Sequence, residues 1–218
     1  MGLESAYGIG SLKPGVCTST TRPAVPFDGQ TISETDTDSL QVYKGTAWAP
    51  ASALTFIASA SPSAVGSISF NSCFSATYAN YLIFANFTAS VGANAEINMR
   101  LRVGGTDATT NYNWNLMNSP SSAGAPTTTA SLGAALFNFT QIDPTYNVSA
   151  TQCTLFDPFT TNKTLMSVNT QTHLSTGRYD NRLVTGYNSN ATSYDGFSLI
   201  TTGTSFTGTI RVYGYSNS

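Results

Sequence analysis

The sequence predicts an all-β protein whose main part is an antiparallel β-sandwich, and three observations support this prediction. Thr, Ser and Asn supply 77 of the 218 residues and Tyr, Phe and Trp a further 25, a composition that favours strands and turns. The helix formers Lys, Glu and Gln are scarce. Short apolar segments recur along the chain and are separated by Gly, Pro, Asn and Ser. The net charge of −2 and the 40% hydrophobic share are typical of a folded chain.

Residues 1–50 differ from the rest and are predicted to form an N-terminal attachment arm and a small β-hairpin. They hold eight of the twenty charged residues and four of the nine prolines. Residues 1–28 show neither a helical nor a strand period, and their prolines favour an extended, irregular backbone. Residues 31–35 and 40–44 flank the turn-forming sequence Asp-Thr-Asp-Ser, which predicts the hairpin.

Residues 51–218 are predicted to form the sandwich as one domain. Eleven strand candidates follow each other at close spacing: 54–59, 65–70, 80–88, 95–103, 111–117, 132–140, 148–156, 164–170, 181–187, 195–201 and 208–215. A jelly roll with eight core strands in two sheets is the expected topology. The low-complexity segment 119–129 is expected to be a long loop.

Three of these segments indicate how their faces are covered. Residues 97–103 alternate apolar and polar side chains, so we expect one of their faces in the core. Residues 81–87 are apolar on both faces, which predicts a strand that is covered on each side. In the last strand, Ile210 and Val212 are expected to point inward.

The side chains that catalysis requires are sparse, and the protein is predicted not to be an enzyme. His173 is the only histidine, and nothing in the sequence pairs it with a nucleophile. Of the six acidic residues after residue 50, five lie in turn-like sequences, where Asp is expected. The sixth, Glu96, is expected to pair with a nearby arginine. Three cysteines without a Cys-x-x-Cys motif favour neither a disulfide framework nor a zinc site, so we expect no metal and no cofactor.

The charge pattern also argues against two classes of partner. Nine basic residues against eleven acidic ones, with a pI of about 5.1, do not provide the basic surface that nucleic acid requires. No apolar run approaches the ~18 residues that a membrane span needs. The first residues also lack the pattern of a secretory signal. The sequence therefore predicts neither nucleic-acid binding nor membrane insertion.

Three segments near the N-terminus form a specific pattern. They are residues 15–23 (GVCTSTTRP), 26–37 (PFDGQTISETDT) and 42–48 (VYKGTAW). This pattern resembles a module of virion structural proteins in tailed bacteriophages, where it occurs in minor tail proteins, tail fibres and head decoration proteins. Segments 76–81, 100–107 and 208–215 are also similar to such proteins, so the likeness covers most of the chain.

The resemblance implies a homotrimeric β-sandwich on the virion surface, assembled in the host bacterial cytoplasm and held to the particle by its N-terminal segment. The partner expected for that segment is the major capsid protein or another virion protein. Its composition gives little burial within the chain, so its apolar side chains are available as anchors in a neighbour's grooves. The anchor candidates are Leu3, Tyr7, Ile9, Leu12 and Val16.

Two functional hypotheses remain. In the first, the protein is a decoration or cement protein that is present in many copies and reinforces the virion. In the second, it is a tail fibre or tail-tip adhesin that binds a host-surface glycan or protein. The adhesin hypothesis predicts exposed aromatic side chains able to stack on sugars, with Tyr112, Trp114, Tyr187 and Tyr194 as candidates. A lectin-like protein of the host cell is a third possibility, but it would leave the phage-like segments unexplained.

Overall fold

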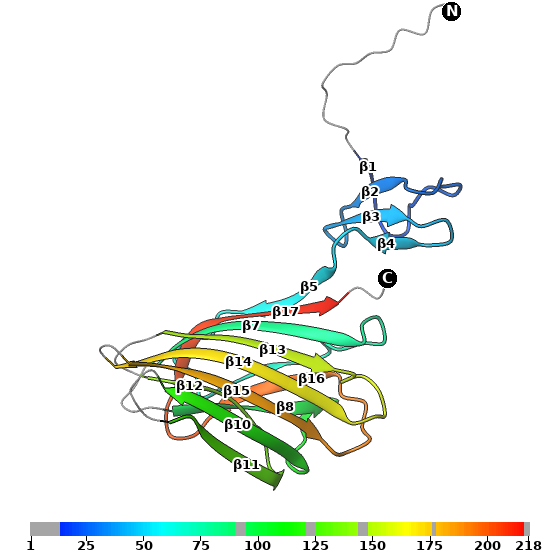
Figure 1. Ribbon diagram of the computed structural model, residues 1–218. Helices are drawn as coiled ribbons and strands as arrows, with labels where there is room; N and C mark the ends of the chain where they lie inside the picture. Colours follow the sequence, from blue (N-terminus) through cyan, green and yellow to red (C-terminus); the bar gives the residue numbers. More distant parts are fainter. Residues whose placement is uncertain (1–13, 90–94, 121–124, 144–147, 176–177, 216–218) are drawn as a thin grey trace, which may run out of the picture. The chain divides into compact units, whose positions relative to one another are not determined.

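The protein is built from β-strands and consists of two units (Figure 1). The computed structural model describes residues 14–89, 95–120, 125–143, 148–175 and 178–215. Within these ranges it contains seventeen strands and no helix, which confirms the all-β prediction. The chain divides between Ala53 and Leu54 into an N-terminal unit and a C-terminal β-sandwich. None of the described residues forms a helix with the length and apolar character needed to cross a bilayer.

The N-terminal unit is a four-stranded sheet. Its strands are β1 (Gly15–Cys17), β2 (Thr31–Glu34), β3 (Ser39–Tyr43) and β4 (Trp48–Pro50), in that spatial order. Strands β2 and β3 pair antiparallel and confirm the predicted hairpin. The irregular backbone expected for residues 1–28 is wrong at residues 15–17, because β1 pairs parallel with β2. Asp38 in the hairpin turn has a φ of 47°, a conformation that Asp tolerates. Ile32 is the buried apolar side chain of the unit, and the rings of Tyr43 and Trp48 lie 5.4 Å apart.

The sandwich consists of two antiparallel sheets, the larger of which curls over the smaller (Figure 1). The larger sheet has the strand order β11-β10-β15-β14-β13-β7-β17-β5. Its strands are β5 (Leu54–Ala60), β7 (Asn80–Ala89), β10 (Tyr112–Pro120), β11 (Thr127–Ala134), β13 (Val148–Phe156), β14 (Thr164–Ser175), β15 (Arg178–Asn188) and β17 (Phe206–Tyr215). The smaller sheet has the order β12-β8-β16-β6, with β9 paired to β8. Its strands are β6 (Ser67–Phe70), β8 (Ala95–Val103), β9 (Thr106–Asp107), β12 (Phe137–Ile142) and β16 (Gly196–Thr201).

Each of the eleven predicted strands overlaps an observed strand, but the prediction is wrong between residues 119 and 140. Segment 119–129 is not a loop throughout, because β10 extends to Pro120 and β11 begins at Thr127, whose partner is Asn118. Segment 132–140 is not one strand, because β11 and β12 are separated by a bend at residues 135–136. The sheets hold eight and five strands instead of eight in total, so the jelly-roll topology stays a prediction.

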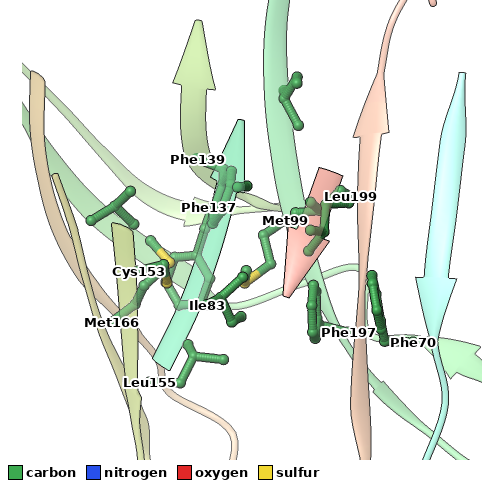
Figure 2. Close-up of a cluster of buried hydrophobic side chains, with 14 of the residues drawn as sticks. Phe70, Ile83, Met99, Phe137, Phe139, Cys153, Leu155, Met166, Phe197 and Leu199 are labelled. Carbon is green, nitrogen blue, oxygen red and sulfur yellow. The ribbon is translucent and has the colours of Figure 1, made fainter. Parts of the chain in front are cut away.

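The core lies between the two sheets. Figure 2 shows Ile83, Cys153, Leu155 and Met166 of the larger sheet together with Phe70, Met99, Phe137, Phe139, Phe197 and Leu199 of the smaller one. The rings of Phe70 and Phe197 are stacked, with centroids 4.8 Å apart and an interplanar angle of 10°. The inward positions predicted for β8 and β17 are confirmed by full burial of Ile97, Met99, Leu101, Ile210 and Val212, but the alternation fails at Val103, which is 46% exposed at the end of β8.

The larger sheet is covered on one face only in the described part of the chain. In β7, Tyr81, Ile83, Ala85 and Phe87 are buried against the core, whereas Phe84 on the opposite face is 39% exposed. The prediction that residues 81–87 are covered on each side is therefore wrong for Phe84 and Asn86, which are exposed on the opposite face, whereas Leu82 on that face is buried. The strand is apolar on both faces, but the smaller sheet packs on only one of them. We call the opposite side of the larger sheet the outer face.

The core packing predicts a large loss of stability when an inward ring is removed. Replacement of Phe197, which stacks on Phe70, by Ala is expected to lower the free energy of unfolding of the sandwich by about 3–5 kcal/mol, since it leaves a cavity between the sheets. Val103→Ala is the control. Because Val103 is 46% exposed at the end of β8, this variant is expected to change the free energy of unfolding by at most about 0.5 kcal/mol. Denaturant unfolding followed by Trp114 fluorescence in a Trp48→Phe background measures both. Similar midpoints for the two variants would contradict this description of the core.

Candidate functional site

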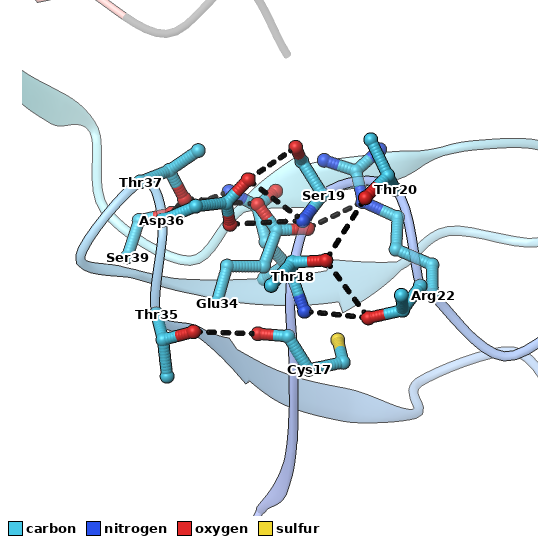
Figure 3. A network of polar contacts seen from close by, with 12 residues as sticks. Cys17, Thr18, Ser19, Thr20, Arg22, Glu34, Thr35, Asp36, Thr37 and Ser39 are labelled. Carbon is cyan, nitrogen blue, oxygen red and sulfur yellow. Dashed lines mark hydrogen bonds and ion pairs between the residues drawn. The ribbon is translucent and has the colours of Figure 1, made fainter.

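The N-terminal unit contains a network of polar contacts that joins residues 17–22 to residues 34–37 (Figure 3). Arg22 forms an ion pair with Glu34, whose side chain is buried. Glu34 also accepts a hydrogen bond from the Thr37 hydroxyl at 2.9 Å. Because charge-assisted hydrogen bonds are stronger than neutral ones, this pair is the main polar contact of the network.

A second carboxylate holds the loop after β1. Asp36 accepts hydrogen bonds from the backbone N–H of Ser19, at 2.9 Å, and from its hydroxyl. The backbone carbonyl of Cys17 accepts from the N–H of Thr35 at 3.0 Å and from its hydroxyl at 3.3 Å. The residues that form these contacts are those of the CTS…R and ETDT patterns. In the structure, therefore, these patterns serve to hold the N-terminal unit together.

These contacts lower the pKa values of both carboxylates. The hydrogen bond from the Arg22 guanidinium is the main cause that lowers the pKa of Glu34, and it outweighs the effect of burial. The hydrogen bonds from Ser19 lower the pKa of Asp36. Both carboxylates are therefore held in the ionised form, in which they accept these hydrogen bonds.

The other patterned residues form the turns of the unit. Gly29 and Gly45 have φ values of 82° and 81°, which favour glycine. The N–H of Gly29 donates to the carbonyl of Tyr43 at 2.8 Å. This backbone leaves Phe27 exposed beside a hollow of about 590 Å³, which is lined by Pro14, Gly15, Phe27, Gly29, Gln30, Thr31 and Leu40.

Of the predicted anchor residues, the structure describes Val16. It lies on the edge strand β1, and 71% of its surface is exposed, so it is accessible to a partner. Leu3, Tyr7, Ile9 and Leu12 lie outside the described residues. The anchor role of all five stays a prediction.

Two of the four aromatic residues expected to stack on sugars are buried. The hydroxyl of Tyr112 donates to the carbonyl of Ala108 at 2.8 Å and accepts from the N–H of Leu101 at 2.9 Å. The hydroxyl of Tyr194 donates to the side-chain oxygen of Asn188 at 3.0 Å. Both rings belong to the core, so the expectation of exposed Tyr112 and Tyr194 is wrong. Their hydroxyl groups form hydrogen bonds with backbone and amide groups in the interior. The sequence does not show that these partners are nearby.

The other two, Trp114 and Tyr187, border one groove on the outer face. The groove has a volume of about 550 Å³, and its apolar lining also includes Leu132, Phe156 and Leu165. The Lys163 ammonium lies 5.4 Å from the ring centroid of Tyr187. Trp114 is half-buried against the core, and its indole N–H donates to the carbonyl of Leu136 at 3.1 Å. Tyr187 is therefore the more accessible of the two rings.

A buried charged cluster between the sheets was not predicted from the sequence. Arg182 of β15 is almost fully buried and donates to Glu96 at 3.1 Å, to Asn138 at 3.2 Å and to Gln141 at 3.3 Å. Glu96 thus pairs with an arginine 86 positions away in the sequence. Asp180 is also buried and accepts from the side-chain amide of Asn118 at 3.1 Å.

The prediction that Asp180 lies in a turn is wrong, because β15 already begins at Arg178. Asp180, Arg182 and the core residue Val184 alternate along this strand and share its inward face. That spacing is the one sequence signal of the cluster. It could be used only if the extent of the strand were known.

The cysteines of the sandwich and the single histidine lie on separate elements. Cys73 and Cys153 are buried free thiols, and burial raises the pKa of Cys73 to about 12 and also that of Cys153, which keeps both protonated. His173 lies on β14 opposite Tyr179 of β15. In the ranges that the structure describes, no three His, Cys, Asp or Glu side chains come together as metal ligands.

The Arg22–Glu34 pair predicts that the N-terminal unit loses stability in acid. Because the folded-state pKa of Glu34 lies below its unfolded value of about 4.3, its contribution is complete above that pH and is lost as the pH falls through the folded-state pKa. Glu34→Gln is expected to lower the stability of the unit by about 1.5–3 kcal/mol at pH 7 and to weaken its acid dependence. Thermal unfolding from pH 2 to pH 7, followed by Trp48 fluorescence in a Trp114→Phe background, measures both effects.

Asp38→Asn is the matched control for this prediction. It removes an exposed carboxylate from the same turn, and Asn tolerates the positive φ of that position. This variant is expected to retain the acid dependence of the parent protein. If Glu34→Gln and Asp38→Asn behaved alike, the stabilising role assigned to the Arg22–Glu34 pair would be wrong.

Comparison of the chain with known protein families, with curated proteins and with solved structures found no match. The two surfaces available for contact with a partner are thus identified from the described residues alone. One is the hollow of the N-terminal unit beside Phe27, and the other is the groove of the outer face beside Tyr187.

Proposed function

We propose that the protein is a non-enzymatic structural protein of the bacteriophage virion surface, with the N-terminal unit as its attachment device. The observation that carries this proposal is the internal network of the N-terminal unit, because the residues of the phage-like pattern are the ones that form its contacts. The pattern thus specifies a compact folded unit that precedes the sandwich. A trimeric decoration or cement protein is the specific role that we propose.

The surface of the N-terminal unit supports attachment to another protein. Val16, Val25, Phe27 and Leu40 are exposed in a unit of about forty described residues. Phe27 and Leu40 line the same hollow, and exposed apolar side chains that gather in one place are typical of an interaction site. The major capsid protein or another virion protein is the proposed partner, and Val16 is the described member of the anchor set Leu3, Tyr7, Ile9, Leu12 and Val16.

Mass spectrometry of purified particles tests the proposed role. The chain is expected in the particles in many copies, as a cement protein requires. A variant that lacks residues 1–53 is expected to be absent from them, because it lacks the attachment device. The full-length Val103→Ala variant, altered on the smaller sheet, is the control and is expected to be incorporated normally. Particles without the chain would overturn the proposal, and normal incorporation of the truncated variant would overturn the attachment role.

A tail fibre or tail-tip adhesin is the second candidate function, and the groove beside Tyr187 favours it. Tyr187 is exposed and Asn113 and Asn115 line the same groove, so an aromatic ring and amide groups are available to a neutral sugar. An adhesin would be present in few copies per particle. It would also lose glycan binding on Tyr187→Ala, which a glycan array measures.

A further inference from the structure

The outer face of the larger sheet exposes large apolar side chains in cross-strand rows. Phe156 lies opposite Leu165, and Leu165 lies opposite Tyr187, so these three form a row across β13, β14 and β15. Leu183 of β15 lies opposite Met117 of β10. All five side chains are exposed. Directly opposed side chains in a sheet lie about 4.5–5.5 Å apart, so each row is a continuous apolar strip.

The other flank of the outer face carries an aromatic row. The ring of Tyr213 on β17 lies 5.8 Å from that of Phe56 on β5 and 6.1 Å from that of Phe84 on β7. Phe56 and Phe84 are both exposed. Between this row and the strips on β13 to β15 is a hollow of about 250 Å³ lined by the amide side chains of Asn86, Gln152, Asn169 and Gln171.

The outer face is almost free of charge. The eight strands of the larger sheet hold four Asp, Glu, Lys or Arg residues, of which Arg178, Asp180 and Arg182 belong to β15 and Arg211 to β17. Asp180 and Arg182 are buried beneath the sheet, and Arg178 is the first residue of its strand. Away from that strand end, Arg211 is the one such residue among the described positions of these strands that is exposed. Lys163, directly before β14, adds one ammonium group near the Tyr187 ring.

This composition is suited to contact with copies of itself. Apolar side chains of one copy are compatible with those of another in either a two-fold or a ring arrangement, whereas like charges that meet across an interface repel each other. An amide group both donates and accepts hydrogen bonds, so the amide-lined hollow can also pair with a copy of itself. Arg, Asp or Glu clusters suited to a charged partner are not found on the described part of this face.

The size of the outer face is comparable to one side of a standard interface. Eight strands about 4.8 Å apart span ~34 Å, and the six of them that have nine or more residues extend for ~30 Å at ~3.3 Å per residue, which gives a face of at most ~1,000 Å². A standard interface buries roughly 800 Å² on each partner. In a ring, one flank of each copy meets the other flank of a neighbour, so the face of each copy is divided between two contacts.

We propose that the outer face is a self-association surface, occupied in solution by further copies of this chain. The proposal deepens the trimeric part of the proposed function and rests on it, but it is tested on the isolated protein without particles. It assigns the groove beside Tyr187 to an interface between copies.

Mass photometry and light scattering of the purified full chain test the proposal. At micromolar concentration the wild-type protein is expected at about three times its mass of 23.0 kDa. Leu165→Glu places a charge in the centre of one apolar row and is expected to shift the protein to the monomer mass. The matched control is Val103→Glu, which introduces the same charge on the smaller sheet at a residue of similar exposure, 46% against 50% for Leu165. It is expected to leave the assembly unchanged.

Thr185→Arg keeps the test decisive if Leu165→Glu fails to fold. Thr185 is already exposed and lies opposite Ser167 at the centre of the outer face, so Arg is tolerated there in a monomer but not in a packed interface. Circular dichroism verifies that each variant is folded. A wild-type protein that is monomeric at all concentrations would overturn the proposal, and so would folded Leu165→Glu and Thr185→Arg variants that assemble normally. A monomeric wild type that binds neutral polysaccharide through Tyr187 would favour the adhesin instead, without affecting the attachment role of residues 1–53.

Discussion

The sandwich depends on one contact, the packing of the curled larger sheet on the smaller one. Aromatic, aliphatic and sulfur-containing side chains from both sheets fill this layer, and β12 is buried on both sides because the larger sheet curls around it. A sheet has two faces, however, and this contact covers only one face of the larger sheet. The chain compensates by using few charged residues on the other face and many hydroxyl, amide and aromatic ones. The self-association proposed above would cover this second face, which is where the low charge and the apolar rows are found.

Much of the fold could be predicted from local patterns. The alternation in residues 97–103 predicted that Ile97, Met99 and Leu101 lie in the core, although it fails at Val103, and the Asp-rich turn predicted the hairpin. The strand β11 could not be predicted, since Thr127 and its neighbours become a strand only by pairing with β10. Exposure of Phe84 depends on where the smaller sheet ends, and an apolar run contains no such information.

The candidate sites were less predictable, because they are formed by contacts between distant residues. Tyr112 and Tyr194 were expected at the surface, but buried backbone and amide groups hold their hydroxyls in the core. Arg182 and Glu96 come together only through the stacking of the two sheets. Trp114 and Tyr187 border one groove because β10 and β15 are neighbours in the sheet. By contrast, the polar network of the N-terminal unit lies within twenty residues of sequence, where a local pattern suffices to identify it.

The distribution of the three cysteines gives the intact protein a natural position for chemical labelling. Cys73 and Cys153 are buried in the sandwich, and their raised pKa values keep them as unreactive thiols. Cys17 is half-buried at the end of β1, in the N-terminal unit. A maleimide dye applied to the native protein therefore reacts preferentially at Cys17. Fluorescence from that dye reports on the surroundings of the N-terminal unit without any change to the amino-acid sequence.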